Sequence, residues 1–333
     1  MPVYETTRCR FRKPSGFEIE CGVLTVPEDR NKPEGNQVEL HVAIYKSRSQ
    51  NPLLDPVFYL TGGGGGNELE HGDSYLDDGN DAILDQRDFI MFNQRGTKFT
   101  NPYLQCDGLS RFYFELAFDA LPPAEAAARE VAFMAGCRDQ FIEAGIDLNM
   151  YNTTRNAEDL NDLRIALGYD QINIYGGSYG TRAALIYLRR HDDHVRSVIL
   201  DGLAPVAIQL PRFFAADAQE ALDRHLSACA SAPACHQRFP QIKQLLPQTI
   251  ERLRSQPVER WLTHPRTGER ASATVSHTFL VNSLFAMLYS SELSRLLPLA
   301  IERAAGDDFE LLLALGDLMG EPEHQLSLGM HLA

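Results

Sequence analysis

Long apolar runs are missing from this sequence: no stretch of about 18 consecutive apolar residues, the length of a membrane-spanning helix, occurs in it. It therefore contains no candidate for a transmembrane helix. Residues 1–9 also lack the basic start and the apolar middle of a secretory signal peptide. We therefore expect no export signal within the sequence as written.

Positive charge is scarce as well. Asp and Glu number 45 against 31 Lys and Arg, which leaves a net charge of -14 at pH 7. The summed field of such a chain repels nucleic acids and anionic membranes, so a polynucleotide partner is not expected. Internal repeats and low-complexity segments are also lacking, apart from five consecutive glycines at residues 62–66.

Metal-type cysteine spacing is a third absence, because none of the six cysteines forms a Cys-x-x-Cys pair. No metal site is therefore expected. The cysteines instead fall into couples that are close in the sequence: Cys9 with Cys21, Cys106 with Cys137, and Cys229 with Cys235. Such couples favour disulfides and a periplasmic or secreted location, in which case an export signal has been lost with an incomplete N-terminus. Reduced thiols in a cytoplasmic protein are the alternative.

The overall composition is that of an ordinary globular protein. The 333 residues are 44% hydrophobic and 23% charged, enough for one large core or two domains. Residues 17–26 and 38–45 alternate apolar and polar side chains, which predicts a half-exposed antiparallel pair of strands. Short, continuously apolar runs are typical of the buried centre of a parallel sheet, and they lie at residues 57–60, 89–92, 172–175 and 198–200.

Helical periodicity separates these runs. It predicts helices over residues 124–144 and 157–167, the second beginning behind Asn156 as its cap and ending at Gly168. Alternating strands and helices indicate an α/β sheet covered on both faces. After residue 205 the pattern is helical with hardly any strand signal. We therefore expect an α/β core over residues 1–204 and a mostly helical cap over residues 205–333.

A Gly-x-Ser-x-Gly motif at residues 176–180 lies between the strand at 172–175 and a helical pattern that follows it. A serine on such a turn adopts strained backbone angles, and only small neighbours such as Gly176 and Gly180 let the turn close. This arrangement is a nucleophile elbow, and it makes Ser178 the candidate nucleophile. A structural glycine-rich turn is the alternative.

The five glycines follow the buried strand at 57–60. A phosphate-binding loop is excluded, because no Gly-Lys-Ser/Thr follows and no Gly-x-Gly-x-x-Gly spacing is completed. Backbone N–H groups that closely approach an oxyanion are a better account. The N–H of Tyr179, with that of Gly63 or Gly64, is expected to form an oxyanion hole. A flexible surface loop is the alternative.

Four segments occur in a familiar order: Leu-Thr followed by glycines at 60–66, Phe-Asn-Gln-Arg-Gly-Thr at 92–97, Thr-Thr-Arg-Asn-Ala-Glu-Asp-Leu at 153–160, and Tyr-Gly-Gly-Ser-Tyr-Gly-Thr at 175–181. Together they resemble the proline iminopeptidase and tripeptidyl aminopeptidase group of α/β-hydrolases. The resemblance covers residues 21–205 well and the cap only loosely. It implies a serine exopeptidase that releases N-terminal residues from peptides with a Ser-His-Asp triad and no cofactor.

The sequence departs from this group at two positions. Gly64 stands where the group usually has proline, which loosens the oxyanion loop, and Asn93 stands where it usually has aspartate. Arg95, in the second segment, is expected to be a structural ion-pair or hydrogen-bonding residue rather than a catalytic one.

The acid and the histidine of the triad are not identified. The resemblance places them after Ser178 on two further strand ends, in Gly-x-x-Asp-Pro-type and Gly-His-type segments that are not present. Asp201 follows a strand but is expected to be structural, and none of the eight histidines after Ser178 has a strand-end setting. We therefore expect a C-terminally truncated α/β-hydrolase whose last strands, with the acid and the histidine, lie outside this sequence.

Truncation would leave apolar surfaces uncovered. The strand that ends at Asp201 would be an unpaired apolar edge over residues 196–200. Helices over residues 291–319 would likewise keep apolar faces without a partner. We therefore expect the chain alone to be aggregation-prone or molten, with its stability and activity restored by about 100 further residues.

Three functions stay open: an aminopeptidase acting through an acyl-enzyme on Ser178, an esterase of the same fold, and an inactive remnant or binding protein. Peptides or small esters are the expected substrates. A free α-ammonium group needs a carboxylate partner in a desolvated pocket, which separates the first function from the second. The carboxylates considered for this role are Glu220, Asp223, Glu292 and Glu302.

Overall fold

The computed structural model describes residues 2–67, 69–70, 72, 74–76, 80–118, 121–209, 212–263, 268 and 270–319. Contacts divide these residues into two compact units. The first unit lies within residues 1–107 and 133–208, and the second within 108–132 and 209–323. The domain boundary expected after residue 204 stays a prediction, because compactness alone does not show which parts fold independently.

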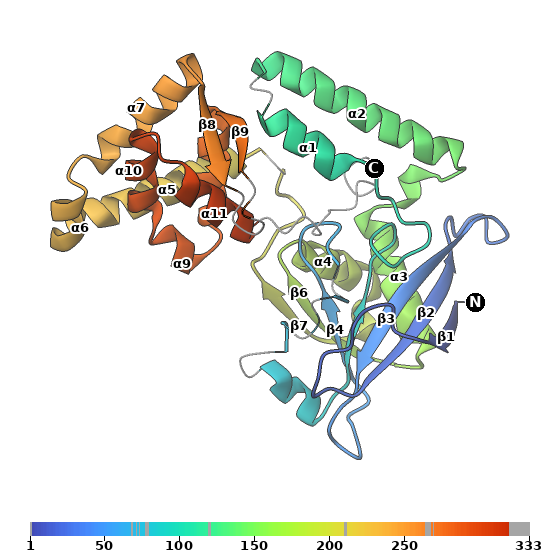
Figure 1. The fold of residues 1–333 in the computed structure, drawn as a ribbon. Coiled ribbons are helices and arrows are strands. Elements are labelled where there is room, and N and C mark those ends of the chain that lie inside the picture. Colours follow the sequence, from blue (N-terminus) through green and yellow to red (C-terminus); the bar gives the residue numbers. More distant parts are fainter. Residues whose placement is uncertain are drawn as a thin grey trace. The chain divides into compact units, whose positions relative to one another are not determined.

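A seven-stranded sheet forms the framework of the first unit (Figure 1). Its strands are β1 (Val3–Thr7), β2 (Ile19–Pro27), β3 (Gln37–Tyr45), β4 (Val57–Leu60), β5 (Phe89–Phe92), β6 (Ile172–Gly177) and β7 (Val195–Asp201). They lie in the order β1-β2-β3-β5-β4-β6-β7, with parallel pairing from β5 to β7 and antiparallel pairing elsewhere. The expected α/β sheet is thus confirmed, and β1 is an additional strand.

Helices α3 (Thr153–Ala166) and α4 (Tyr179–His191) pack on each other and on the strands. Short 3₁₀ helices are η1 (Asn80–Asp85), η2 (Leu148–Met150) and η3 (Asp192–His194). Phe58 and Leu60 of β4 lie in one buried cluster with side chains of α3 and α4, whereas Val57 and Tyr59 lie in another cluster with Leu84 of η1. Successive side chains of a strand point to opposite faces, so the apolar run of β4 is buried on both faces of the sheet.

Helix α3 begins at Thr153, and its N-cap is Asn152, whose side chain accepts a hydrogen bond from the N–H of Arg155. The prediction that this helix begins behind Asn156 is therefore wrong. Asn156 lies one turn inside the helix, is 3% exposed, and donates to Gln94 Oε1 at 2.9 Å. Both asparagines have the right chemistry for a cap, but only Asn152 has the extended backbone that a cap requires.

Strand β7 is an edge of the sheet in the described part of the chain, since it pairs with β6 alone. Its Ile199 side chain is 54% exposed, while β4 and β5 are buried throughout. Within the described residues, β7 thus has the unpaired edge expected over residues 196–200.

The second unit is mostly helical. Its elements are α1 (Leu109–Phe118), the beginning of α2 (Pro123–Glu143), α5 (Phe214–Ser231), α6 (Pro233–Arg238), α7 (Ile242–Ser255), β8 (Val258–Thr263), β9 (Arg270–Val275), α8 (His277–Met287), α9 (Ser291–Ser294), α10 (Leu297–Ala305) and α11 (Glu310–Met319). Strands β8 and β9 form an antiparallel pair, which corrects the expectation of hardly any strand after residue 205.

Helices α10 and α11 bury their apolar faces inside this unit. Leu297, Ile301 and Leu312 are fully buried in a cluster that also contains Leu253 of α7 and Leu280 of α8. The expectation that the helices over residues 291–319 keep apolar faces without a partner is therefore wrong.

Disulfides join all three expected cysteine couples, and no free cysteine remains. The bridges are Cys9–Cys21, Cys106–Cys137 and Cys229–Cys235, with Cα atoms 5.2, 5.6 and 5.1 Å apart. The second bridge encloses residues 108–132, the part of the second unit that interrupts the first. The pairing predicted from sequence proximity is confirmed.

Candidate active site

Ser178 lies in a sharp turn between the end of β6 and the start of α4. Its side chain is exposed, and its backbone has φ 52° and ψ -116°, a left-handed conformation that L-residues rarely adopt. Such a conformation costs about 1–3 kcal/mol and persists only where the surroundings enforce it. The strand-to-helix turn expected around Ser178 is thus present.

Two glycines make this turn possible. A Cβ atom on Gly176 would lie 2.6 Å from the carbonyl oxygen of Gly180, and one on Gly180 would lie 1.8 Å from that of Leu60. Both positions are too close for any side chain, because the obstructing atoms belong to the backbone. The motif therefore requires glycine at these positions so that α4 can approach β4 and β6.

The backbone of Ser178 is held on both sides. Its N–H donates to the carbonyl oxygen of Asp201 at 2.8 Å, and its own carbonyl accepts from the N–H and the hydroxyl of Thr181 at 3.0 and 2.6 Å. The Thr181 hydroxyl in turn accepts from the N–H of Ala204 at 2.8 Å. The segment after β7 therefore fixes the elbow, even though its residues lie far from Ser178 in the sequence.

The glycine loop after β4 lies directly against the elbow. A Cβ atom on Gly62 would be 3.0 Å from Cβ of Ser178, and one on Gly64 would be 3.5 Å from the ring of Tyr179. Gly63 and Gly64 have φ 80° and 58°, so a proline, whose φ is fixed near about -65°, does not fit at position 64 in this conformation. Glycine, and not the proline that is usual in the group, therefore fits position 64 of this loop.

The backbone amide of Tyr179 is available for a ligand by its position. Tyr179 is the first residue of α4, and the first N–H groups of a helix have no acceptor one turn earlier. The helix dipole adds partial positive charge at the same place. The structure thus brings the predicted residues Ser178, Tyr179 and Gly64 together, with Gly63 in the same loop; their catalytic roles stay predictions.

The phenol of Tyr179 is half-buried, and its oxygen lies 2.8 Å from Oγ1 of Thr153. Burial raises the pKa of Tyr179, while the interactions with Thr153 and Asn156 act in the opposite direction. The residue is therefore neutral at physiological pH, and its hydroxyl connects the elbow to α3.

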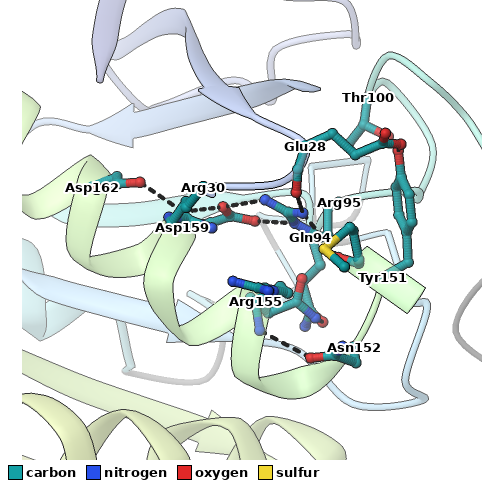
Figure 2. A network of polar contacts seen from close by, with 12 residues as sticks. Glu28, Arg30, Gln94, Arg95, Thr100, Tyr151, Asn152, Arg155, Asp159 and Asp162 are labelled. Atoms are coloured by element: carbon teal, nitrogen blue, oxygen red, sulfur yellow. Dashed lines mark hydrogen bonds and ion pairs between the residues drawn. The ribbon is translucent and has the colours of Figure 1, made fainter. Parts of the chain in front are cut away.

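Arg95 is the centre of a buried polar network (Figure 2). Its guanidinium is 0% exposed and binds both carboxylate oxygens of Asp159 at 2.7 Å, while Nη1 donates to the carbonyls of Glu28 and Met150 at 2.9 Å. Arg30 adds a further contact to Asp159 at 2.7 Å. Every Arg95 nitrogen is occupied within the protein, which confirms the expected structural role.

Asn93 also has a structural role. Its Nδ2 donates to Oδ1 of Asn67 at 2.7 Å, and the side chain is 0% exposed. An aspartate, the usual residue of the group here, has no N–H to donate in its ionised form. Asparagine is therefore compatible with this neighbour.

A base for Ser178 is not found among the described residues. In the first unit, His41 is buried and accepts a hydrogen bond from the N–H of Arg10. His191 lies beside Glu158, and Nδ1 of His194 lies 2.9 Å from the carbonyl oxygen of Asp170. Three further described histidines belong to the second unit: His225, His236 and His277. The remaining ones after Ser178 lie outside the described residues: His264, His324 and His331.

Asp201 supports the elbow through its backbone carbonyl, which accepts the hydrogen bond from the N–H of Ser178. Its carboxylate accepts a hydrogen bond from the hydroxyl of Tyr175 at 3.1 Å. This contact agrees with the structural role expected for Asp201. The acid and the base of the predicted triad both remain unassigned.

The four carboxylates considered for ammonium recognition all have local partners. Glu220 pairs with Arg224 and Glu302 with Arg238, while Asp223 accepts from Gln219. Glu292 accepts hydrogen bonds from two neighbouring serine hydroxyls, which lowers its pKa. These contacts leave none of the four as an obvious site for an added ammonium group.

Asp217 lines a small pocket in the second unit that sequence reasoning missed. The pocket has a volume of about 200 Å³ and is lined by Phe214, Asp217, Ala218, Ala221, Phe285, Leu288 and Tyr289. The spacing of the α5 residues, 214, 217, 218 and 221, is that of one helix face, which was the available sequence signal. A carboxylate beside aromatic rings suits an organic cation.

No cluster of side chains that would hold a metal ion occurs in the described ranges. Within the same ranges, no helix is long and apolar enough to cross a membrane.

Comparison with known proteins identifies relatives of two kinds. A tripeptidyl aminopeptidase of Streptomyces lividans is 32% identical over 195 residues, which are 56% of this chain and 35% of that protein. Serine protease Hip1 of Mycobacterium bovis is 26% identical over 246 residues, which are 69% of this chain and 46% of that protein. The chain thus spans less than half the length of these curated relatives.

Among solved structures, proline iminopeptidase of Mycobacterium smegmatis is 17% identical with a TM-score of 0.34, covering 66% of this chain and 59% of that chain. The sequence relatives confirm the resemblance to the tripeptidyl aminopeptidase group that the four segments indicated. The family model described as the alpha/beta hydrolase fold matches residues 55–279, more than half of the chain and all of the elbow. The chain therefore belongs to the alpha/beta hydrolase fold family.

Proposed function

We propose that this chain is a serine peptidase of the aminopeptidase type, which releases N-terminal residues from peptides through an acyl-enzyme on Ser178. The observation that carries this proposal is the elbow: Ser178 is exposed, has φ 52°, and lies against the glycine loop. Its similarity to tripeptidyl aminopeptidases and serine proteases supports the choice of substrate class.

The proposed reaction begins with attack of Ser178 Oγ on the carbonyl carbon of the scissile peptide bond. The hydroxyl proton passes to a base and then to the leaving amine as the C–N bond breaks, and water later hydrolyses the ester. Negative charge develops on the carbonyl oxygen, where the N–H groups of Tyr179 and of Gly63 or Gly64 stabilise it. Neither the base nor its acidic partner is assigned to a described residue.

A fluorophosphonate probe tests the nucleophile in the natural full-length protein. We expect one phosphonyl adduct on the peptide that contains Ser178, and none in the Ser178→Ala variant, with mass spectrometry as the readout. A variant that loses labelling but keeps its melting temperature locates the nucleophile without a folding defect. Absence of an adduct from the unsubstituted protein would reject the peptidase and favour the inactive binding protein.

The pocket around Asp217 is a candidate cation site within the second unit. Its volume of about 200 Å³ is below the range of about 300–1,000 Å³ typical of whole-ligand pockets, so it suits a single residue. The carboxylate of Asp217 and the rings of Phe214 and Tyr289 have the chemistry that binds a free ammonium group. An acetyl ester has no cation to place there.

Turnover of aminoacyl arylamides with free and with acetylated N-termini tests this assignment, beside simple acetyl esters. We expect the free amines to be cleaved best. Asp217→Asn tests whether the pocket of the second unit takes the α-ammonium group: a rise in KM of about tenfold is the result if a charged hydrogen bond is lost. Glu220→Gln is the matched control: it removes a carboxylate of the same helix that is paired with Arg224, and its KM should not change. Turnover of esters alone would remove the peptidase claim, and equal cleavage of acetylated substrates would remove the role of Asp217.

A further inference from the structure

The side chain of Tyr179 is fixed at a place where the proposed chemistry uses only its backbone. Its hydroxyl lies 2.8 Å from Oγ1 of Thr153, the first residue of α3. Asn156, one turn further along α3, also acts on the phenol, since it lowers the pKa of Tyr179. One helix thus holds the hydroxyl through Thr153 and brings Asn156 to it.

Asn156 is itself fixed by a buried partner. The Nδ2 group of Asn156 donates to Oε1 of Gln94 at 2.9 Å, and Gln94 is 1% exposed. The next residue, Arg95, binds Asp159 of α3 through the buried bidentate pair (Figure 2). The loop after β5 therefore fixes α3, and α3 in turn fixes the phenol of Tyr179.

The ring of Tyr179 also lies beside the second proposed source of oxyanion donors. A Cβ atom built on Gly64 would lie 3.5 Å from Cδ2 of the ring, so the Gly64 backbone passes close to it. Displacement of the ring would therefore move the Tyr179 amide directly and remove the support of the Gly64 backbone.

Oxyanion stabilisation depends on donors that are already in place when charge develops. Loss of one such donor costs about 10²–10³ in kcat, and small misplacements have large effects, because the donors must match the transition state and not the substrate. A side chain that fixes both donors at once is therefore expected to affect kcat far more than KM.

We propose that Thr153 and Asn156 position the oxyanion hole by clamping the phenol of Tyr179 between α3 and the glycine loop. Thr153, Asn156 and the Tyr179 hydroxyl are positioning groups, which act through the Tyr179 and Gly64 backbones. This inference rests on the proposed function of Ser178.

The test removes single hydroxyls from the natural full-length protein. Tyr179→Phe keeps the ring and deletes the clamped oxygen, and Thr153→Val deletes its partner. We expect each variant to lower kcat for an aminoacyl arylamide by about tenfold at unchanged KM, and to slow fluorophosphonate labelling of Ser178 in parallel. Thr153→Ser retains the hydroxyl and should restore most of kcat.

Tyr187→Phe is the matched control. Tyr187 is another tyrosine of α4, is 0% exposed, and its hydroxyl lies 3.4 Å from Asn161 of α3, away from the elbow. Removal of that hydroxyl should leave kcat unchanged.

The outcomes separate the clamp from the function on which it rests. If Ser178 is labelled and Tyr179→Phe turns over like Tyr187→Phe, the clamp is refuted while the serine peptidase stands. Equal losses in Thr153→Ser and Thr153→Val would also refute it, since only the second lacks the hydroxyl. If Ser178 of the unsubstituted protein is not labelled, the proposed function fails and the clamp fails with it.

Discussion

At the scale of single residues, His41 is a histidine kept neutral by its surroundings. Its side chain on β3 is 0% exposed, Nε2 accepts from the N–H of Arg10, and Nδ1 has no hydrogen-bond partner within the described part of the chain. Burial lowers the pKa of His41 from 6.5 to about 4, and the charge of Arg10 acts in the same direction. Protonation of His41 therefore opposes folding.

The stability of the protein should fall as the pH drops through this window. Below pH 6.5 the unfolded chain binds a proton at His41, whereas the folded chain does not bind it until about pH 4. Between about pH 7 and about pH 5 this single group should remove about 2 kcal/mol from the free energy of unfolding. Urea titrations of the natural protein and of His41→Gln, which keeps an acceptor, measure the difference. The same pH dependence in both proteins would contradict the assignment.

The elbow could be predicted residue by residue because its constraints are local. A strand, a glycine, a serine and a helix within residues 172–191 define Ser178 and the Tyr179 amide without any distant partner. Asp217 could not be found in this way. An aspartate in the first turn of a helix already has a local explanation in the helix dipole, and its aromatic neighbours Phe285 and Tyr289 lie far along the sequence.

At the scale of elements, the bidentate pair between Arg95 and Asp159 joins the loop after β5 to α3. Both side chains are 0% exposed. Asp159→Asn would leave the guanidinium buried without its counter-charge, so we expect a loss of about 3–5 kcal/mol in the free energy of unfolding. Glu220→Gln, in an exposed pair with Arg224, should cost less than about 1 kcal/mol. Similar losses in the two variants, measured by chemical denaturation, would show that burial does not strengthen the first pair.

The elements that the sequence pattern missed are those whose burial depends on distant partners. Strand β8 has no continuous apolar run: Trp261 is 63% exposed, and of its residues only Leu262 is buried. Its pairing with β9 therefore left little trace in the hydrophobic pattern. The same reason explains why the burial of α10 was not predicted: the residues that cover its apolar face come from α7 and α8. Periodicity shows which face of a helix is apolar but not what covers it.

At the scale of the whole molecule, three disulfides close loops of very different length. The partners are 31 residues apart in Cys106–Cys137 but 6 apart in Cys229–Cys235. Loop-closure entropy then assigns about 4 kcal/mol to the first bridge and about 2 kcal/mol to the second. Replacement of each pair by serines, followed by chemical denaturation, should reproduce this order.

The bridges also favour an oxidising compartment, such as a periplasm or the outside of the cell. Intact mass of the protein from its native host should be lower by about 2 Da for each bridge, because two hydrogens leave as an S–S bond forms. Free thiols at all six cysteines would place the protein in a reducing compartment. The order of the bridges' contributions to stability would then not apply to the protein in its natural state.

The left-handed backbone of Ser178 lowers the stability of the fold at the residue that supplies the proposed nucleophile. Glycine occupies φ 52° with little strain, whereas alanine carries the same Cβ atom as serine. Ser178→Gly should therefore be more stable than Ser178→Ala by about 1 kcal/mol, although both lack the hydroxyl. Equal melting temperatures of the two variants would show that the turn holds no strain. If the difference is found, selection for activity has retained a residue that selection for stability would replace.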